Sequence, residues 1–388
     1  MSRLRYTWLP SLLIGFVLLG CSPPAVELAD EAMPTRLAQV SMPEQLSPQP
    51  KGEDDTSGSD KYLFHDSHFH LTNYVQEGTD IRHFLKIMDD KVGRSMLCGI
   101  PLQQQWMYGS TGDFAPTYYT QTDAPLYYYS FTDAIIAHEY LRLLPEQRQR
   151  FDPMITGFNP TDMYAADHIR RVLLTYPGVF SGIGEFSIHK EFVSSKVAGE
   201  VATLDNKALD RILDFAAEVG LPVVLHCDVD TPFPRPNQDP YIVQKLRELA
   251  DRHPDTIIIW AHIGVGRVVR PVADQLGMVE RGLRDRESKN VHFDISWDET
   301  AKYIVGSPEA IQATADLINR YPDRFLFGTD CVAPQSQEQY LQVYEIYKPL
   351  LDKLTPEARQ LLLKGNYERI FDEARLKVRA WEAANKRP

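Results

Sequence analysis

The chain has 388 residues, 43% of them hydrophobic, so it is long enough to bury a large core in one decorated domain. Its formal net charge of −12 argues against a surface that binds nucleic acid or anionic membranes. The charge says little about a small-molecule substrate, which meets only the local charges of a pocket.

The first 21 residues have the pattern of an export signal. Arg3 and Arg5 are positively charged, and the apolar stretch Leu9–Leu19 is too short to span a bilayer well. The stretch ends in Leu18-Leu19-Gly20-Cys21, which resembles a bacterial lipoprotein cleavage site. That resemblance implies that Cys21 is lipid-modified, and the alternative is an ordinary signal peptide with a chance cysteine.

Residues 22–60 are rich in Pro, Ser, Ala, Glu and Asp, and we expect a disordered tether because such a segment buries little apolar surface. The folded domain is expected over residues 61–388. Ser22, not Asp, follows the cysteine, which by lipoprotein resemblance favours the outer membrane. We therefore expect a lipid-anchored protein of the bacterial cell envelope that faces the periplasm.

From Tyr62 onward, short apolar runs alternate with amphipathic stretches such as Asn206–Val219 and Pro308–Arg320. Continuous apolar runs suit strands that are buried on both faces, and eight β-α units close into a (β/α)8 (TIM) barrel. The long gap after the second run, from Pro101 to Asp152, predicts an insertion that either covers the site or packs on the barrel. The eight predicted strands are Tyr62–Phe69, Ser95–Ile100, Met154–Phe158, Val179–Glu185, Leu221–Leu225, Thr256–Ala261, Val291–Ser296 and Arg324–Thr329.

Two histidines, His68 and His70, lie at the end of the first run. Residues two apart on a strand point the same way, so both imidazoles should reach one point in the barrel mouth. Four more polar residues end other runs, where barrel enzymes carry their catalytic groups. These are Glu185 after the fourth run, His226 after the fifth, His262 after the sixth and Asp330 after the eighth.

This set resembles the amidohydrolase superfamily, in particular its amidohydrolase-related group, and the likeness covers most of residues 62–371. Its motifs here are Asp66-x-His68-x-His70, Gly184-Glu185, His226, His262-Ile263-Gly264, Gly328-Thr329-Asp330 and a closing Gly365-Asn366-Tyr367-Glu368-Arg369-Ile370-Phe371. The combination is specific for the superfamily but not for a reaction.

The resemblance implies a catalytic divalent metal held by His68, His70, His226 and Asp330. Imidazole and carboxylate ligands favour zinc, and manganese or iron is also chemically reasonable. Asp330 would also accept the proton of the attacking water. His262 would bind a second ion or polarise the scissile carbonyl. Glu185 decides the ion count, and we favour one tightly held metal with a weaker second.

Three further residues are candidates for substrate binding. Arg235 and Arg267 follow the fifth and sixth runs, and either could clamp a carboxylate. Trp297 follows the seventh run and is expected to line the pocket.

The expected reaction is hydrolysis of a C–O or C–N bond, as in a lactone, ester or amide, by metal-activated water. The alternative is a metal-dependent decarboxylase or hydratase on the same scaffold, because both use the same ligands. A barrel that binds but has lost activity, and a phosphoesterase, are weaker alternatives. The sequence leaves open whether the chain forms a homodimer.

Overall fold

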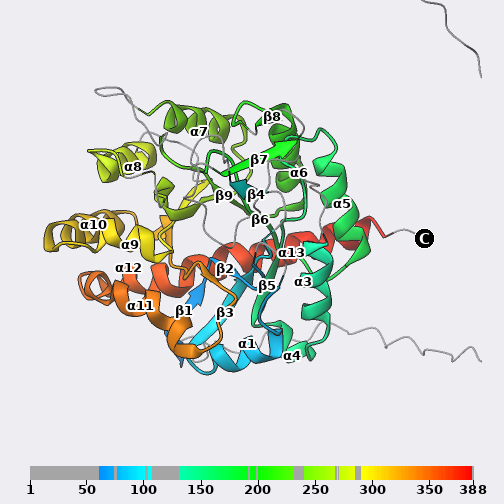
Figure 1. The fold of residues 1–388 in the computed structure, drawn as a ribbon, viewed down its shortest axis with the longest axis horizontal. Helices are drawn as coiled ribbons and strands as arrows, with labels where there is room; N and C mark the ends of the chain where they lie inside the picture. Colours follow the sequence, from blue (N-terminus) through cyan, green and yellow to red (C-terminus); the bar gives the residue numbers. More distant parts are fainter. Residues whose placement is uncertain are drawn as a thin grey trace, which may run out of the picture. The chain divides into compact units, whose positions relative to one another are not determined.

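The computed structural model describes residues 61–73, 77–100, 104–106, 131–190, 193–197, 200–201, 203–230, 240–266, 269, 271–284 and 290–386. Eight strands of this part form one parallel sheet, and each pairs with the next in chain order (Figure 1). They are β1 (Phe64–Asp66), β3 (Val92–Leu97), β5 (Phe151–Ile155), β6 (Gly182–Ser187), β9 (Val223–His226), β10 (Ile258–Trp260), β11 (Val291–Asp294) and β12 (Phe325–Leu326).

The last strand returns to the first and closes the sheet. The Ser67 N–H donates to the carbonyl of Phe327 at 3.1 Å, and the Asp330 N–H donates to the carbonyl of His68 at 2.7 Å. Beyond this seam, β13 (Cys331–Val332) pairs in parallel with β2 (Phe69–His70). The predicted (β/α)8 barrel is confirmed, and its closure brings the first histidines beside Asp330.

Side-chain alternation along the strands separates two apolar clusters. Outward-facing residues such as Val223, Trp260 and Phe293 belong to the large cluster under the helices. Inward-facing residues form a second cluster with side chains of the C-terminal helix α13 (Asn366–Ala384), which crosses the middle of the view (Figure 1). The barrel interior is therefore a packed core, filled by Met96, Cys98, Met154, Val224, Ile259, Ala261, Leu326, Tyr367, Ile370 and Phe371.

The surrounding helices follow from apolar periodicity and local caps. In α6 (Lys207–Val219), the side chain of Asn206 accepts from the Ala208 N–H, and Gly220 ends the helix at φ 80°. No helix among the described residues is long and apolar enough to cross a membrane. The other α-helices are α1 (Ile81–Met88), α3 (Thr132–Leu141), α4 (Pro145–Arg148), α5 (Ala165–Thr175), α7 (Tyr241–Arg252), α8 (Gln275–Arg284), α9 (Asp298–Ile304), α10 (Pro308–Arg320), α11 (Gln337–Leu351) and α12 (Pro356–Gln360).

The insertion predicted after the second barrel strand is present. It contains β4 (Gln104–Trp106), α3 and α4, and β4 pairs antiparallel with β7 (Val193–Val197), which in turn pairs with β8 (Glu200–Val201). Asp133 at the start of α3 is buried and accepts from the backbone N–H groups of Thr156 and Gly157 at 2.7 and 3.0 Å. These bonds attach the insertion to the loop that follows β5.

A buried ion network anchors α13 under the barrel. Asp152 on β5 accepts from Arg94 at 2.9 Å, from Arg375 at 2.6 Å and from the Tyr367 hydroxyl at 2.7 Å. Burial alone would raise the pKa of Asp152, but the two guanidinium groups hold it below its usual range. The carboxylate is therefore ionised and fully paired.

The same network explains two boundary errors. The sequence predicts strands at Ser95–Ile100 and Met154–Phe158, whereas β3 and β5 begin three residues earlier, at Val92 and Phe151. Arg94 and Asp152 interrupt the apolar pattern of these strands, and their mutual pairing between the neighbouring strands β3 and β5 is not visible in the sequence.

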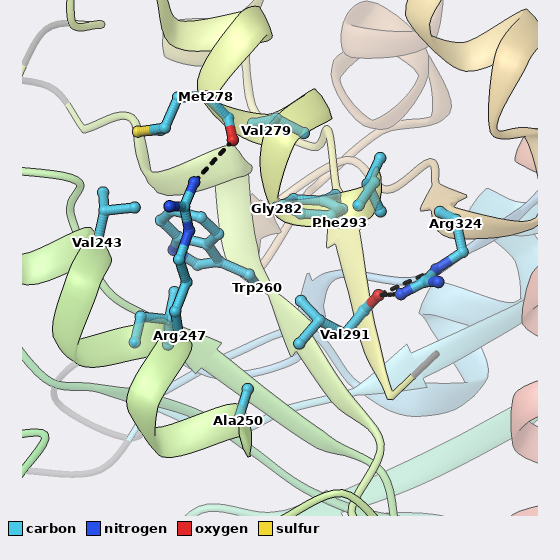
Figure 2. Close-up of a pocket in the computed structure, with 12 residues that line it drawn as sticks. Val243, Arg247, Ala250, Trp260, Met278, Val279, Gly282, Val291, Phe293 and Arg324 are labelled. Carbon is cyan, nitrogen blue, oxygen red and sulfur yellow. Dashed lines mark hydrogen bonds between the residues drawn. The ribbon is translucent and has the colours of Figure 1, made fainter. Parts of the chain in front are cut away.

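An apolar pocket lies outside the barrel, between α7, α8 and the outward faces of β10 and β11 (Figure 2). Its two guanidinium groups are turned to backbone carbonyls, with Arg247 donating to Met278 and Arg324 to Val291. Trp260 and Phe293, which line it, belong to the outer cluster and not to the barrel interior. The pocket is therefore separate from the strand ends that carry the histidines.

Asp133→Asn is expected to change the pH dependence of stability. Burial raises the pKa of Asp133 from 3.8 to about 6, so the folded chain binds this proton more tightly than the unfolded chain. The protonated carboxyl contributes stability that is complete below pH ~4 and is lost as the pH rises through 6, by up to about 3 kcal/mol. Relative to wild type, the neutral variant should gain unfolding free energy from pH 4 to 7 in urea titrations.

The matched control is Asp316→Asn, which removes an exposed carboxylate from α10. Its stability curve should run parallel to that of the wild type. An Asp133→Asn curve that is also parallel to wild type would contradict this account of Asp133.

Candidate metal centre

Six side chains predicted from the sequence converge at the C-terminal ends of the barrel strands. Every one except Asp330 is at least 95% buried, and the Asp330 side chain is 13% exposed. Three groups of three have ligand atoms within 4.8 Å of one another: His68, His262 and Asp330; His68, His70 and Glu185; and Glu185, His226 and His262.

Glu185 lies between two pairs of histidines. Its Oε2 atom is 3.6 Å from His68 Nε2 and 3.4 Å from His70 Nε2. Its Oε1 atom is 2.8 Å from His226 Nδ1 and 3.7 Å from His262 Nε2. Each carboxylate oxygen therefore serves a different pair of imidazoles.

Asp330 also faces both sides of the cluster. Its Oδ1 atom is 3.1 Å from His70 Nε2 and 3.4 Å from His68 Nε2, while its Oδ2 atom is 3.8 Å from His262 Nε2. Because Asp330 is the most exposed of the six, it is the carboxylate that reaches the opening of the site.

The buried carboxylates attract positive charge. Burial alone would raise the pKa of Asp330, but the charge of His68 and the hydrogen bond from His70 hold it below its usual range. Burial would lower the pKa of His68, yet Asp330 and Asp294 raise it well above the usual value. The pKa of His70 is likewise raised, against burial, by Asp330 and Glu185. The cluster is therefore built to hold a cation, whether protons or a metal ion.

His226 and His262 differ in charge although both face Glu185. Burial lowers the pKa of His262, and the neighbouring charges of His68 and His226 keep it low. Burial and the charge of Lys190 oppose protonation of His226, but Asp228 and Glu185 raise its pKa overall. His226 Nε2 lies 3.1 Å from Asp228 Oδ1, so both of its ring nitrogens face carboxylates.

Lys190 follows Glu185 by five residues in the chain. The structure places its charge close enough to affect Glu185. Burial would raise the pKa of Glu185, but Lys190 and the bonds to His226 and His262 lower it well below the usual value. Glu185 itself occupies the position between the two histidine pairs.

The residues fit a divalent metal. His68 Nε2 is buried and has no hydrogen-bond partner among the described residues, although it points at two carboxylates. Such an orphaned nitrogen is costly unless it binds something. Imidazole nitrogens and carboxylate oxygens are the ligand set of zinc, and they also suit manganese and iron.

Close backbone contacts bring the eighth strand against the first. A Cβ atom on Gly328 would lie 2.7 Å from His68 Cβ and from the His68 backbone nitrogen, so only glycine fits there. Asp66 accepts from the Thr329 hydroxyl and the Tyr340 hydroxyl, both at 2.7 Å, and takes no part in the cluster. Burial raises the pKa of Asp66 to about 6. These contacts explain the glycine and the first aspartate of the two motifs.

The backbone is strained where the site is built. His262, Trp297 and Asp330 have φ values of 56°, 83° and 50°, in the left-handed region that L-residues rarely adopt. Such conformations cost about 1–3 kcal/mol each and persist where the surrounding structure enforces them.

Four residues that support the cluster were missed in the sequence. Asp294, Ser296 and Asp228 contact His68, His262 and His226, respectively. The Cys98 thiol contacts the backbone of Gly184 and Glu185. Asp294 and Ser296 end the seventh run two residues apart, as His68 and His70 end the first, and that spacing was the available signal.

The predicted substrate-binding residues have separate outcomes. The Trp297 ring centroid lies 5.0 Å from that of His262, so this side chain borders the cluster. Arg235 and Arg267 lie outside the described residues.

Similar solved structures share low identity with this chain. One is a protein from Pseudomonas putida described as a 2-pyrone-4,6-dicarboxylic acid hydrolase (15% identity, 80% of this chain and 98% of that one, TM-score 0.49). A second is an amidohydrolase from Burkholderia multivorans with bound zinc (14%, 80% and 99%, TM-score 0.48). A third is the dihydroorotase of Campylobacter jejuni (16%, 80% and 83%, TM-score 0.46). At these scores the likenesses carry no functional argument.

A search of curated proteins found no match. The family model described as Amidohydrolase matches residues 66–372, which include the whole cluster and the beginning of α13. The chain belongs to the amidohydrolase family.

Proposed function

We propose that this metal-dependent hydrolase cleaves a C–O or C–N bond of a small substrate, such as a lactone, ester or amide. The observation that carries the proposal is the placement of two buried carboxylates among four imidazoles, with one carboxylate at the opening. That arrangement can hold a metal and also keep a proton acceptor beside it.

The donor atoms fall into two sets that share Glu185. One set consists of His68, His70, Asp330 and Glu185 Oε2. The other consists of His226, His262 and Glu185 Oε1. We propose a centre of two ions, most simply zinc. This goes beyond the sequence-based expectation of one tight ion with a weaker second, because each oxygen of Glu185 faces its own histidine pair.

A divalent ion, when bound, supplies Lewis acidity and lowers the pKa of a coordinated water. Asp330 stands at the opening and is held ionised, so it can accept a proton from the attacking water and return it to the leaving group. Trp297 beside His262 forms one apolar border for the substrate.

Decarboxylation or hydration on the same scaffold remains the alternative reaction. The test is a panel of lactones, esters and amides beside aromatic carboxylates, scored for hydrolysis and for release of carbon dioxide. Hydrolysis that a chelator abolishes and zinc restores supports the proposal. Carbon dioxide release without hydrolysis would replace it with the alternative.

Glu185→Gln is expected to lower the metal content after dialysis from about two ions per chain to one or fewer. The amide removes the negative charge of the carboxylate that both donor sets share and replaces one of its two oxygens, so each affinity should fall by at least about tenfold. Elemental analysis of the purified protein measures this.

The matched control for that test is Glu368→Gln, which removes a carboxylate paired with His65 at 2.9 Å, outside the cluster. The control should keep the wild-type metal content. A Glu185→Gln protein that also kept two ions would refute the proposal that both donor sets share Glu185.

Asp330→Asn should reduce kcat by about 10²–10⁴ on whichever substrate the panel identifies, because an amide cannot accept the proton. Circular dichroism should show an unchanged fold. Asp372→Asn is the control, since Asp372 pairs with Arg94 outside the cluster. Near-wild-type turnover by Asp330→Asn would show that another group moves the proton.

We also infer from the sequence that Cys21 carries a lipid and holds the enzyme on the outer membrane, facing the periplasm. Residues 1–60 lie outside the described part of the structure. Cys21→Ser should move the protein from the membrane fraction to the supernatant of disrupted cells, while its activity per molecule is retained. A variant that stays with the membranes would overturn lipidation at this residue.

A further inference from the structure

Two polar residues at the end of β11 lie behind the histidine cluster. Asp294 and Ser296 have no exposed surface. Asp294 Oδ2 is 2.6 Å from His68 Nδ1 and accepts from the Ser296 hydroxyl at 2.7 Å. The Ser296 hydroxyl oxygen is in turn 3.0 Å from His262 Nδ1. One carboxylate thus reaches two histidines, one directly and one through a hydroxyl.

The protons available in this series of hydrogen bonds determine which atom donates in each contact. An ionised carboxylate only accepts, so the proton shared with Asp294 must sit on His68 Nδ1. The Ser296 hydroxyl has a single proton, and it is used toward Asp294. Its oxygen can therefore only accept from His262, which places a proton on His262 Nδ1 as well.

When each ring is neutral, its proton therefore sits on Nδ1, and its unprotonated Nε2 points toward the cluster. For His68, that Nε2 lies 3.4 Å from Asp330 Oδ1 and has no hydrogen-bond partner in the part of the chain that the structure describes. For His262, it lies 3.7 Å from Glu185 Oε1 and 3.8 Å from Asp330 Oδ2. The two rings also stack, with centroids 4.8 Å apart and planes at 29°, which restrains their rotation.

The geometry assigns Asp294 and Ser296 as a positioning pair that fixes the Nδ1–H tautomer of His68 and His262. This inference rests on the proposed two-ion function. It decides the open role of His262, because a ring with its lone pair turned inward binds a metal ion and cannot donate a hydrogen bond to a scissile carbonyl. The seventh strand therefore controls one ligand in each half of the centre.

Substitutions can remove the contact to His68 and the contact to His262 separately. Ser296→Ala removes the acceptor for His262 and leaves the contact between Asp294 and His68. Asp294→Asn disturbs both branches, because an amide can donate to His68 Nδ1 and reverse its tautomer. Ser296→Thr keeps the hydroxyl and should rescue. Thr256→Val is the control, since it removes a buried hydroxyl that donates to the Leu213 carbonyl at 2.8 Å, away from the cluster.

Zinc binding to the metal-depleted full-length protein, followed by calorimetry, provides the first measurement. Wild type, Ser296→Thr and Thr256→Val should bind two ions. Ser296→Ala should keep one ion at wild-type affinity and weaken the second by about 10–100-fold, whereas Asp294→Asn should weaken both. Wild-type binding by both Ser296→Ala and Asp294→Asn would overturn the inference while leaving the proposed function intact.

The second measurement does not depend on metal. Long-range ¹⁵N–¹H spectra of histidine-labelled, metal-free protein report the tautomer of His262, whose signal is assigned by its loss in His262→Asn. The expected form is Nδ1–H in wild type and a mixture of tautomers in Ser296→Ala. An Nε2–H form in wild type would overturn the inference. Absence of zinc binding by wild type would overturn the proposed function, and the spectra would still decide the tautomer.

Discussion

The constraint that governs this molecule is the burial of two carboxylates, Glu185 and Asp330, in the mouth of a closed barrel. Removing an ionised group from water is costly unless opposite charge compensates it. Here the imidazoles of His68, His70 and His226 supply that compensation by holding protons, as their raised pKa values show. A divalent cation would compensate the same two negative charges, and it would carry more positive charge in a smaller volume than the protonated imidazoles.

The rest of the barrel keeps these charges in place. At the seam, Asp66 binds the strand that carries Asp330, and Gly328 allows that strand to approach His68. On α13, Arg375 and Tyr367 reach Asp152 inside the barrel and hold the helix against it. Breaking a buried ion pair by removing one partner typically costs about 3–5 kcal/mol, because the other charge is left unpaired, so these contacts hold α13 in place.

The six cluster residues were predictable because each ends an apolar run, and the carboxyl ends of parallel strands meet at one edge of a barrel. The residues behind them were not predicted. His68 and Asp294 are 226 positions apart and meet only because the barrel closes. Arg94 and Asp152 caused the errors in two predicted strand boundaries for a related reason. A charged residue within an apolar run suggests that the strand has not yet begun, unless its buried partner on the next strand is known.

The sequence by itself determined the alternating β-α pattern, the donor types at the strand ends and the family, because side-chain periodicity encodes which face and which end of a strand a residue occupies. Only the tertiary structure decided how the donors divide: which oxygen of Glu185 faces which histidine pair, which carboxylate reaches the opening, and which nitrogen of His262 points inward. Those choices depend on distances of 3–4 Å between side chains on different strands. Barrel closure and the packing beneath it set such distances, and no local pattern in the chain records them.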